Sequence, residues 1–127
     1  MRVHKFMRRI PLDEGVPIGV RDLLSAYQVE SVPDIGLAGL TNGDLIRSAE
    51  ADGFEVMVTC DQNMRCQQNL TGRRLAIIVL TTNHWDTIRT NSESVLPAIE
   101  SSAPGSLSVV AMPKPPPRRR RYPRPQS

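Results

Sequence analysis

The sequence predicts an α/β domain, a three-layer α/β/α sandwich with a mostly parallel central sheet. Short segments of strand length, apolar throughout or alternating apolar and polar, alternate along the chain with longer segments whose apolar residues have helical spacing. The run at residues 75–80 is apolar throughout, which is typical of a central parallel strand that is buried on both faces. A chain of 127 residues suits one domain of ordinary size. Together these observations favour one sheet covered by helices.

The first half of the chain predicts three strands and two helices. The expected strands cover residues 8–12, 28–32 and 54–59, and the expected helices cover residues 16–27 and 41–51. Pro11 is awkward in the first strand because it lacks the N–H that a central strand donates. Thr41 is a suitable residue to cap the second helix, and Gly53 marks its end.

The second half continues the alternation. A polar segment at residues 61–69 is expected to be helical, followed by the apolar strand at residues 75–80. Residues 85–101 have helical spacing, and Pro97 is expected to kink or break that helix. A last strand is expected at residues 107–111.

Composition divides the chain into residues 1–7 as an N-terminal extension, 8–112 as the domain, and 113–127 as a Pro/Arg-rich tail expected to be disordered. From residue 114 on there are six Lys/Arg and no acids, against ten Lys/Arg and thirteen Asp/Glu before it. The net charge of +3 therefore comes from the tail alone. The tail is either a solvated extension or an electrostatic arm that adds salt-dependent affinity for RNA.

A cytoplasmic location is expected from three features. No apolar h-region follows the basic residues 1–9, and no apolar run approaches the length of a membrane helix. Cys60 and Cys66 form neither a disulfide framework nor a zinc pattern, and free thiols suit a reducing compartment.

Several acidic and amide side chains follow the predicted strands. Asp13 and Glu14 follow the first strand, Asp61 follows the strand at 54–59, and Asn83 follows the strand at 75–80. In a parallel sheet these ends share one edge, where binding sites form. Clustered carboxylates repel one another, and a hard cation such as Mg²⁺ or Mn²⁺ offsets that repulsion. Such a cation suits phosphodiester cleavage.

Asp44, at the start of the second helix, is a further candidate for this edge. Each acid also has an ordinary structural explanation. Asp44 suits the first turn of a helix, Asp61 suits a helix cap, and Asp13 suits a turn beside glycine. Both interpretations stay open for each residue.

The sequence resembles a known family over roughly residues 8–112. Residues 32–46, 53–64 and 67–80 are similar to small bacterial PIN-like domain proteins. The most specific part is residues 54–80, where a strand ends in Val-x-Val-Thr-x-Asp-x-Asn and Gln-Gln-Asn follows shortly after. The Leu-Asp-Glu segment at residues 12–14 fits the same pattern.

The resemblance implies a metal-dependent endoribonuclease, the toxin component of a toxin–antitoxin module. It implies Mg²⁺ or Mn²⁺ as cofactor, RNA as substrate, a cognate antitoxin protein as partner, and a possible homodimer. Asp13, Asp44 and Asp61 match the acidic positions of the family and would hold the metal, with Asn83 and Glu14 as neighbouring candidates.

The chain also departs from the family pattern. Gly15 stands where asparagine is usual, and the region of the expected fourth acid offers Asn83 and His84. A catalytically decayed module that binds nucleic acid or protein is therefore the alternative. A third interpretation is a receiver-type phosphoacceptor domain, which requires a lysine after the last strand; Lys114 is the only lysine there, within the Pro-rich region.

Overall fold

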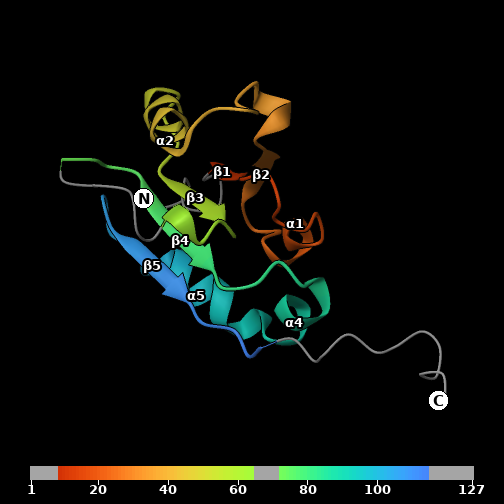
Figure 1. Ribbon diagram of the computed structural model, residues 1–127. Helices are drawn as coiled ribbons and strands as arrows, with labels where there is room; N and C mark the ends of the chain where they lie inside the picture. The colour runs from red at the N-terminus through yellow and green to blue at the C-terminus, as the bar shows by residue number, and fades with distance from the viewer. Residues whose placement is uncertain (1–8, 65–71, 115–127) are drawn as a thin grey trace, which may run out of the picture.

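The computed structural model describes residues 9–64 and 72–114. The expected extension at residues 1–7, residues 65–69 of the expected helix and residues 115–127 of the expected tail lie outside these ranges. In the described part, five strands form one all-parallel sheet in the order β2-β1-β3-β4-β5 (Figure 1). The strands are β1 (Arg9–Leu12), β2 (Gln28–Ser31), β3 (Val56–Thr59), β4 (Ala76–Leu80) and β5 (Leu107–Val110). The predicted α/β class is thus confirmed, with a sheet that is parallel throughout.

The order of the strands reverses between β1 and β3. The chain runs outward from β1 to β2 and then returns to the other side of β1 to form β3 and β4. In the β1–β3 pair, Leu12 lies opposite Val58, and Pro11 has no N–H to offer. In open parallel sheets, ligands bind beyond the carboxyl ends of the strands at such a reversal. The segments after β1 and β3 are therefore the place to look for a site.

Helices connect the strands. The α-helices are α1 (Val20–Leu23), α2 (Asn42–Ala51), α4 (Trp85–Thr90) and α5 (Val95–Glu100), and the 3₁₀ turns are η2 (Pro33–Ile35) and η3 (Ser92–Ser94). Figure 1 shows α2 on one side of the strands and α1, α4 and α5 on the other. Thr41 caps α2 as expected, because its hydroxyl accepts the backbone N–H of Asp44 at 3.3 Å.

Two aliphatic cores cover the two faces of the sheet. One joins alternate strand residues such as Ile10, Val58 and Ile78 to the apolar residues of α1, α4 and α5. The other joins Met57 and Ile77 to α2 and its neighbouring loops. Every residue of β4 is at most 2% exposed, which explains why its sequence is apolar without alternation.

Two predicted helices differ from the structure. The segment at residues 16–27 holds only the four-residue α1, and the bonds around it run from residue i to residue i−3, as from Val20 N to Pro17 O. Tight 3₁₀-like turns replace the expected long helix. The helix expected at 85–101 breaks at residues 91–94, upstream of Pro97. Pro97 itself lies in the first turn of α5. Proline is tolerated there because the backbone N–H groups of a first turn have no intrahelical acceptor.

None of the helices in residues 9–64 and 72–114 combines the length and the hydropathy that a membrane span requires.

Candidate active-site cleft at the carboxyl ends of the strands

A cleft of about 320 Å³ opens beyond β1, β3 and β4, and we call it the carboxyl-end cleft. Its lining includes Asp13, Glu14, Asn42, Cys60, Asp61 and Asn83. Four of the five sequence candidates therefore meet in one place, as the parallel topology predicts.

The fifth candidate, Asp44, is not among the residues that line the cleft. Its carboxylate pairs with Arg47 one turn along α2, and its side chain is 50% exposed. The backbone N–H of Asp44 is held by the Thr41 cap. In this arrangement Asp44 acts as a first-turn helix acid, the structural explanation that the sequence had left open.

Asp13 is fixed at the end of β1 by four hydrogen bonds, one of which its carbonyl oxygen accepts from Val16 N–H at 3.2 Å. Its backbone N–H donates to Val58 O at 2.9 Å and so takes part in the pairing of β1 with β3. Its carboxylate accepts the backbone N–H of Glu14 on Oδ1 and the hydroxyl of Thr59 on Oδ2, both at 2.8 Å. The carboxylate therefore has one orientation, set by groups on two strands.

The pKa of the Asp13 carboxyl is raised above its ordinary value, mainly because it is partly buried. The hydrogen bonds from Thr59 and from Glu14 N–H lower this pKa, while the negative charges of Asp61 and Glu14 raise it. Burial and like charges outweigh the hydrogen bonds. The surroundings of Asp13 therefore disfavour the negative charge of its carboxylate.

Asp61 lies two residues beyond β3, and its carboxylate, like that of Asp13, accepts a hydrogen bond on each oxygen. Its Oδ1 accepts the backbone N–H of Asn63 at 2.9 Å, and its Oδ2 accepts the side-chain amide of Asn42 at 3.1 Å. Its backbone N–H donates to Thr59 Oγ1 at 3.0 Å. Thr59 thus contacts both aspartates of the cleft.

Sequence reasoning missed Thr59 and Asn42. Thr59 is fully buried at the end of an otherwise apolar strand, and that polar residue in a core position is the signal that could have indicated it. Asn42 follows the capping Thr41 and gives no sequence signal beyond its place at the start of α2.

Glu14 and Asn83 form the exposed rim of the cleft. Oε1 of Glu14 accepts the backbone N–H of Gly39 at 3.4 Å, which joins the loop after β1 to the loop before α2. Asn83 follows β4, and its neighbour His84 caps α4 by accepting the backbone N–H of Thr87. His84 is therefore a structural cap.

Cys60 lines the cleft but is poorly suited to be a nucleophile. Burial raises the pKa of its thiol to about 11, with a further contribution from the charge of Asp13. The thiol donates to the carbonyl oxygen of Thr82 at 3.3 Å. The chemistry of the cleft therefore depends on its carboxylates and amides.

The donor set suits a cation that keeps much of its water. Within residues 9–64 and 72–114, no three or more His, Cys, Asp or Glu side chains are arranged to hold a metal ion. Mg²⁺, however, is usually bound by one or two carboxylates together with waters and substrate phosphates. Asp13 and Asp61 supply two carboxylates in one cleft, so the residues present fit Mg²⁺ or Mn²⁺ in this partly hydrated form.

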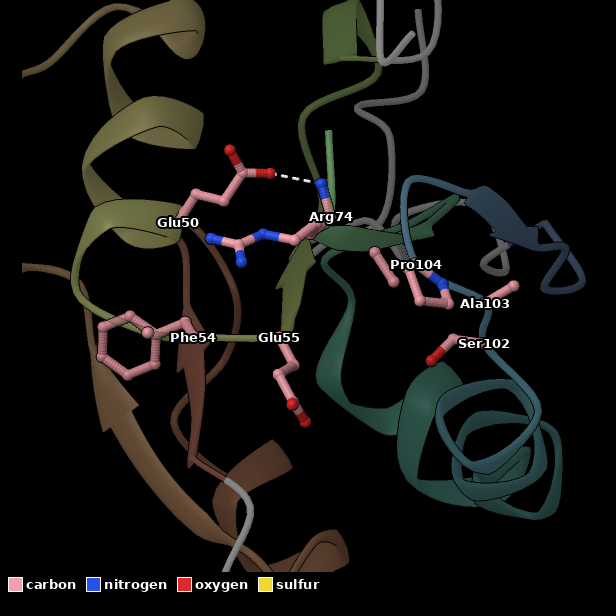
Figure 2. Close-up of a pocket in the computed structure, with 9 residues that line it drawn as sticks. Glu50, Phe54, Glu55, Arg74, Ser102, Ala103 and Pro104 are labelled. Atoms are coloured by element: carbon pink, nitrogen blue, oxygen red, sulfur yellow. Dashed lines mark hydrogen bonds between the residues drawn. The ribbon is translucent and has the colours of Figure 1, made fainter. Parts of the chain in front are cut away.

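A second pocket, of about 270 Å³, lies at the opposite edge of the sheet (Figure 2). Residues before β3 and β4, including Phe54 and Arg74, line it together with Ser102 and Pro104. Glu50 reaches into this region from α2, and its carboxylate accepts the backbone N–H of Arg74, the dashed line in Figure 2. The charge of Glu50 thus serves the fold.

Comparisons with protein-family models, with curated proteins and with solved structures found no match to this chain. What is established is the class: an α/β protein with a five-stranded parallel sheet in the described part and an acidic cleft at the reversal of strand order.

Proposed function

We propose that this protein is a PIN-like, divalent-metal-dependent endoribonuclease. The observation that carries the proposal is the juxtaposition of Asp13 and Asp61 in one cleft, bridged by the buried hydroxyl of Thr59. Two strands that are far apart in sequence bring these carboxylates to the place where open parallel sheets bind ligands. The raised pKa of Asp13 supports a site whose charge is balanced by a bound cation.

Asp13 and Asp61 would hold Mg²⁺ or Mn²⁺. When bound, the ion activates water and stabilises the charge that develops on the phosphate. Asn83 offers amide donors at the rim for the phosphate oxygens of RNA. Glu14 also lies on the rim, where its carboxylate accepts one long hydrogen bond, from Gly39 N–H at 3.4 Å. In this proposal Glu14 positions the attacking water by accepting a hydrogen bond from it.

The resemblance to PIN-like toxins extends the proposal to a partner. An antitoxin protein that inhibits such an enzyme would cover the carboxyl-end cleft and keep RNA out. Leu40, an exposed apolar residue in the lining of the cleft, supports a protein contact there.

The direct test is cleavage of a mixed RNA substrate by the purified full chain with Mn²⁺, with Mg²⁺ and with chelator. We expect metal-dependent cleavage that Asp61→Asn abolishes without unfolding the protein. Asp86→Asn is the matched control, because it makes the same change of charge at an exposed aspartate that pairs with Arg89 on α4, outside the cleft. Cleavage that persists in Asp61→Asn, or in chelator, would exclude this mechanism.

If the folded protein cuts no RNA under any of these conditions, the decayed binding module becomes the better description. Among residues 9–64 and 72–114, Asp13 and Asp61 are the two carboxylates of the cleft that accept a hydrogen bond from another side chain, and this small number favours the alternative. Binding of RNA or of a protein partner that chelator leaves unchanged would support it.

The receiver-type alternative shares one feature with the structure, because receiver domains have the same strand order. Lys114, however, lies exposed four residues beyond the end of β5. A beryllofluoride titration decides this case: saturable binding would support a phosphoacceptor, and no binding would reject one.

A further inference from the structure

Each oxygen of the Asp13 carboxylate accepts one hydrogen bond, and the two donors come from different parts of the chain. The bond to Oδ1 is local, from the backbone N–H of the next residue, Glu14. The bond to Oδ2 comes from Thr59 on the neighbouring strand, 46 residues away. The local bond follows from the turn after β1, whereas the bond from Thr59 requires a hydroxyl at that position of β3.

Asp61 shows the same division. The bond to its Oδ1 is local, from the backbone N–H of Asn63, and the bond to its Oδ2 comes from Asn42 on α2. A carboxylate only accepts, so the amide nitrogen of Asn42 must face it. Each aspartate is thus held by one backbone donor and one side chain from another element.

The direction of the Thr59 hydroxyl is fixed. Its oxygen accepts the backbone N–H of Asp61 at 3.0 Å, and its proton is donated to Asp13 Oδ2 at 2.8 Å. Thr59 is fully buried, so water does not compete for either bond. One hydroxyl therefore sets the position of both aspartates relative to each other.

Asn42, the first residue of α2, lies in the lining of the carboxyl-end cleft. Asp44, two residues further along the helix, is bonded to Arg47 instead. A neutral donor in this place fixes an oxygen of Asp61 without adding a charge that repels it.

We propose that Thr59 and Asn42 are positioning residues that orient Asp13 and Asp61 for a divalent cation, an inference that rests on the proposed function. Neither residue needs to touch the ion. Each carboxylate oxygen accepts one bond from the protein and keeps a second lone pair for the cation or its waters. Loss of such an outer donor typically weakens metal binding by about 10–100-fold.

The test measures Mn²⁺ binding by the full chain, from the electron paramagnetic resonance signal of free Mn²⁺, so that it does not depend on catalysis. Thr59→Val removes the hydroxyl with little change of shape, and we expect the dissociation constant to rise by about 10–100-fold. Thr59→Ser restores the hydroxyl, and we expect near wild-type affinity. Asn42→Ala should weaken binding by a similar factor.

Asn91→Ala is the matched control, because the Asn91 amide also donates side-chain hydrogen bonds, at 2.8 Å to Thr87 O and at 3.3 Å to Thr90 Oγ1, but at the end of α4, outside the cleft. We expect it to leave Mn²⁺ affinity unchanged. Circular dichroism and thermal melting establish that each variant is folded. If Thr59→Val does not fold, Asn42→Ala still decides the proposal, because Asn42 is only partly buried, and unchanged Mn²⁺ affinity in that variant would overturn it.

The outcomes separate the two proposals. If the wild-type chain binds Mn²⁺ and both Thr59→Val and Asn42→Ala bind it equally well, the positioning role is wrong and the metal site stands. If Thr59→Ser binds as weakly as Thr59→Val, the hydroxyl is not responsible, which also overturns the role. If the wild-type chain binds no Mn²⁺, the proposed metal-dependent function itself fails, and the positioning role falls with it.

Discussion

The carboxylate of Glu50 accepts the backbone N–H of Leu75 at 3.0 Å and so holds the start of β4 against α2. The same carboxylate accepts the N–H of Arg74 and pairs with the guanidinium of Arg73 at 3.2 Å. These bonds lower the pKa of Glu50, chiefly through the two backbone N–H groups. One acidic side chain of α2 thus holds the amino end of β4, at the end of the sheet opposite the cleft.

Glu50→Gln should lower the free energy of unfolding at pH 7 by about 1–2 kcal/mol, because it replaces charge-assisted hydrogen bonds with weaker ones. Since the pKa is lower in the folded state, the contribution is present above the unfolded value of about 4.3. It is lost as the pH falls through the folded value. The difference between wild type and variant in urea unfolding should therefore shrink below about pH 4.3.

Glu93→Gln is the control for this measurement, because Glu93 lies exposed on η3. Its substitution should leave the free energy of unfolding nearly unchanged at either pH. A Glu50→Gln difference that stays constant down to pH 2 would contradict the role of the Glu50 charge.

Gly19 packs against the ring of Trp85, and this contact joins α1 to α4. The backbone of Gly19 is helical, with φ −62° and ψ −19°, so alanine is allowed there on conformational grounds. A Cβ atom would nevertheless lie 2.5 Å from Cζ2 of Trp85. We expect Gly19→Ala to destabilise the fold by about 1–3 kcal/mol because the ring must move.

The single tryptophan of the chain provides the measurement, through its fluorescence during urea unfolding. In a Trp85→Leu background, followed by circular dichroism, the cost of Gly19→Ala should fall because the ring is gone. An equal cost in both backgrounds would show that the ring is not the cause.

Cys60 should react slowly with thiol reagents in the folded protein. Its pKa is raised to about 11, whereas an unperturbed cysteine has a pKa of about 8.5. At pH 8.5 the folded thiol is therefore roughly a hundredfold less ionised than the unfolded one, and we expect alkylation to be slower by a similar factor. The rate should rise about tenfold per pH unit up to about pH 11.

The measurement uses Cys66→Ser, because the second cysteine lies outside the described residues. The same chain in urea supplies the unfolded rate. Equal rates in buffer and urea at pH 8.5 would contradict the protection of Cys60.

The strands were predictable because their signals are local. The apolar run that became β4 and the alternation that became β3 show in a few residues each. The long helix expected at 16–27 failed because its extent depends on tertiary packing. The backbone leaves the helical region at Leu24, with φ −112° and ψ 37°, and no local pattern reveals that end.

The site was predictable only in part, and for a related reason. Parallel topology places Asp13 and Asp61 at one edge whatever their side chains do. The roles of Thr59 and Asn42 depend on the direction of individual side chains across strands and layers. The role of Asp44, which sequence and resemblance both placed among the candidates, also depends on the direction of its side chain.

Asp44 provides the sharpest test between the resemblance and the geometry. The resemblance implies a metal ligand, whereas the structure pairs the carboxylate with Arg47 on the surface of α2. On the geometry, Asp44→Asn should leave the Mn²⁺ dissociation constant unchanged, whereas Asp61→Asn should raise it strongly. Asp44→Asn should also lower the free energy of unfolding by about 0.3–1 kcal/mol, because a negative charge in the first turn interacts favourably with the helix dipole.

The experiment compares Mn²⁺ titrations and urea unfolding for the two variants side by side. If Asp44→Asn loses Mn²⁺ as fully as Asp61→Asn, the carboxylate of Asp44 must leave Arg47 and turn into the cleft when the ion binds. The start of α2 would then be a moving part of the site, since Asn42 already bonds Asp61 from that turn. If only Asp61→Asn loses the ion, the cleft works with Asp13 and Asp61 alone, and Asp44 serves the helix.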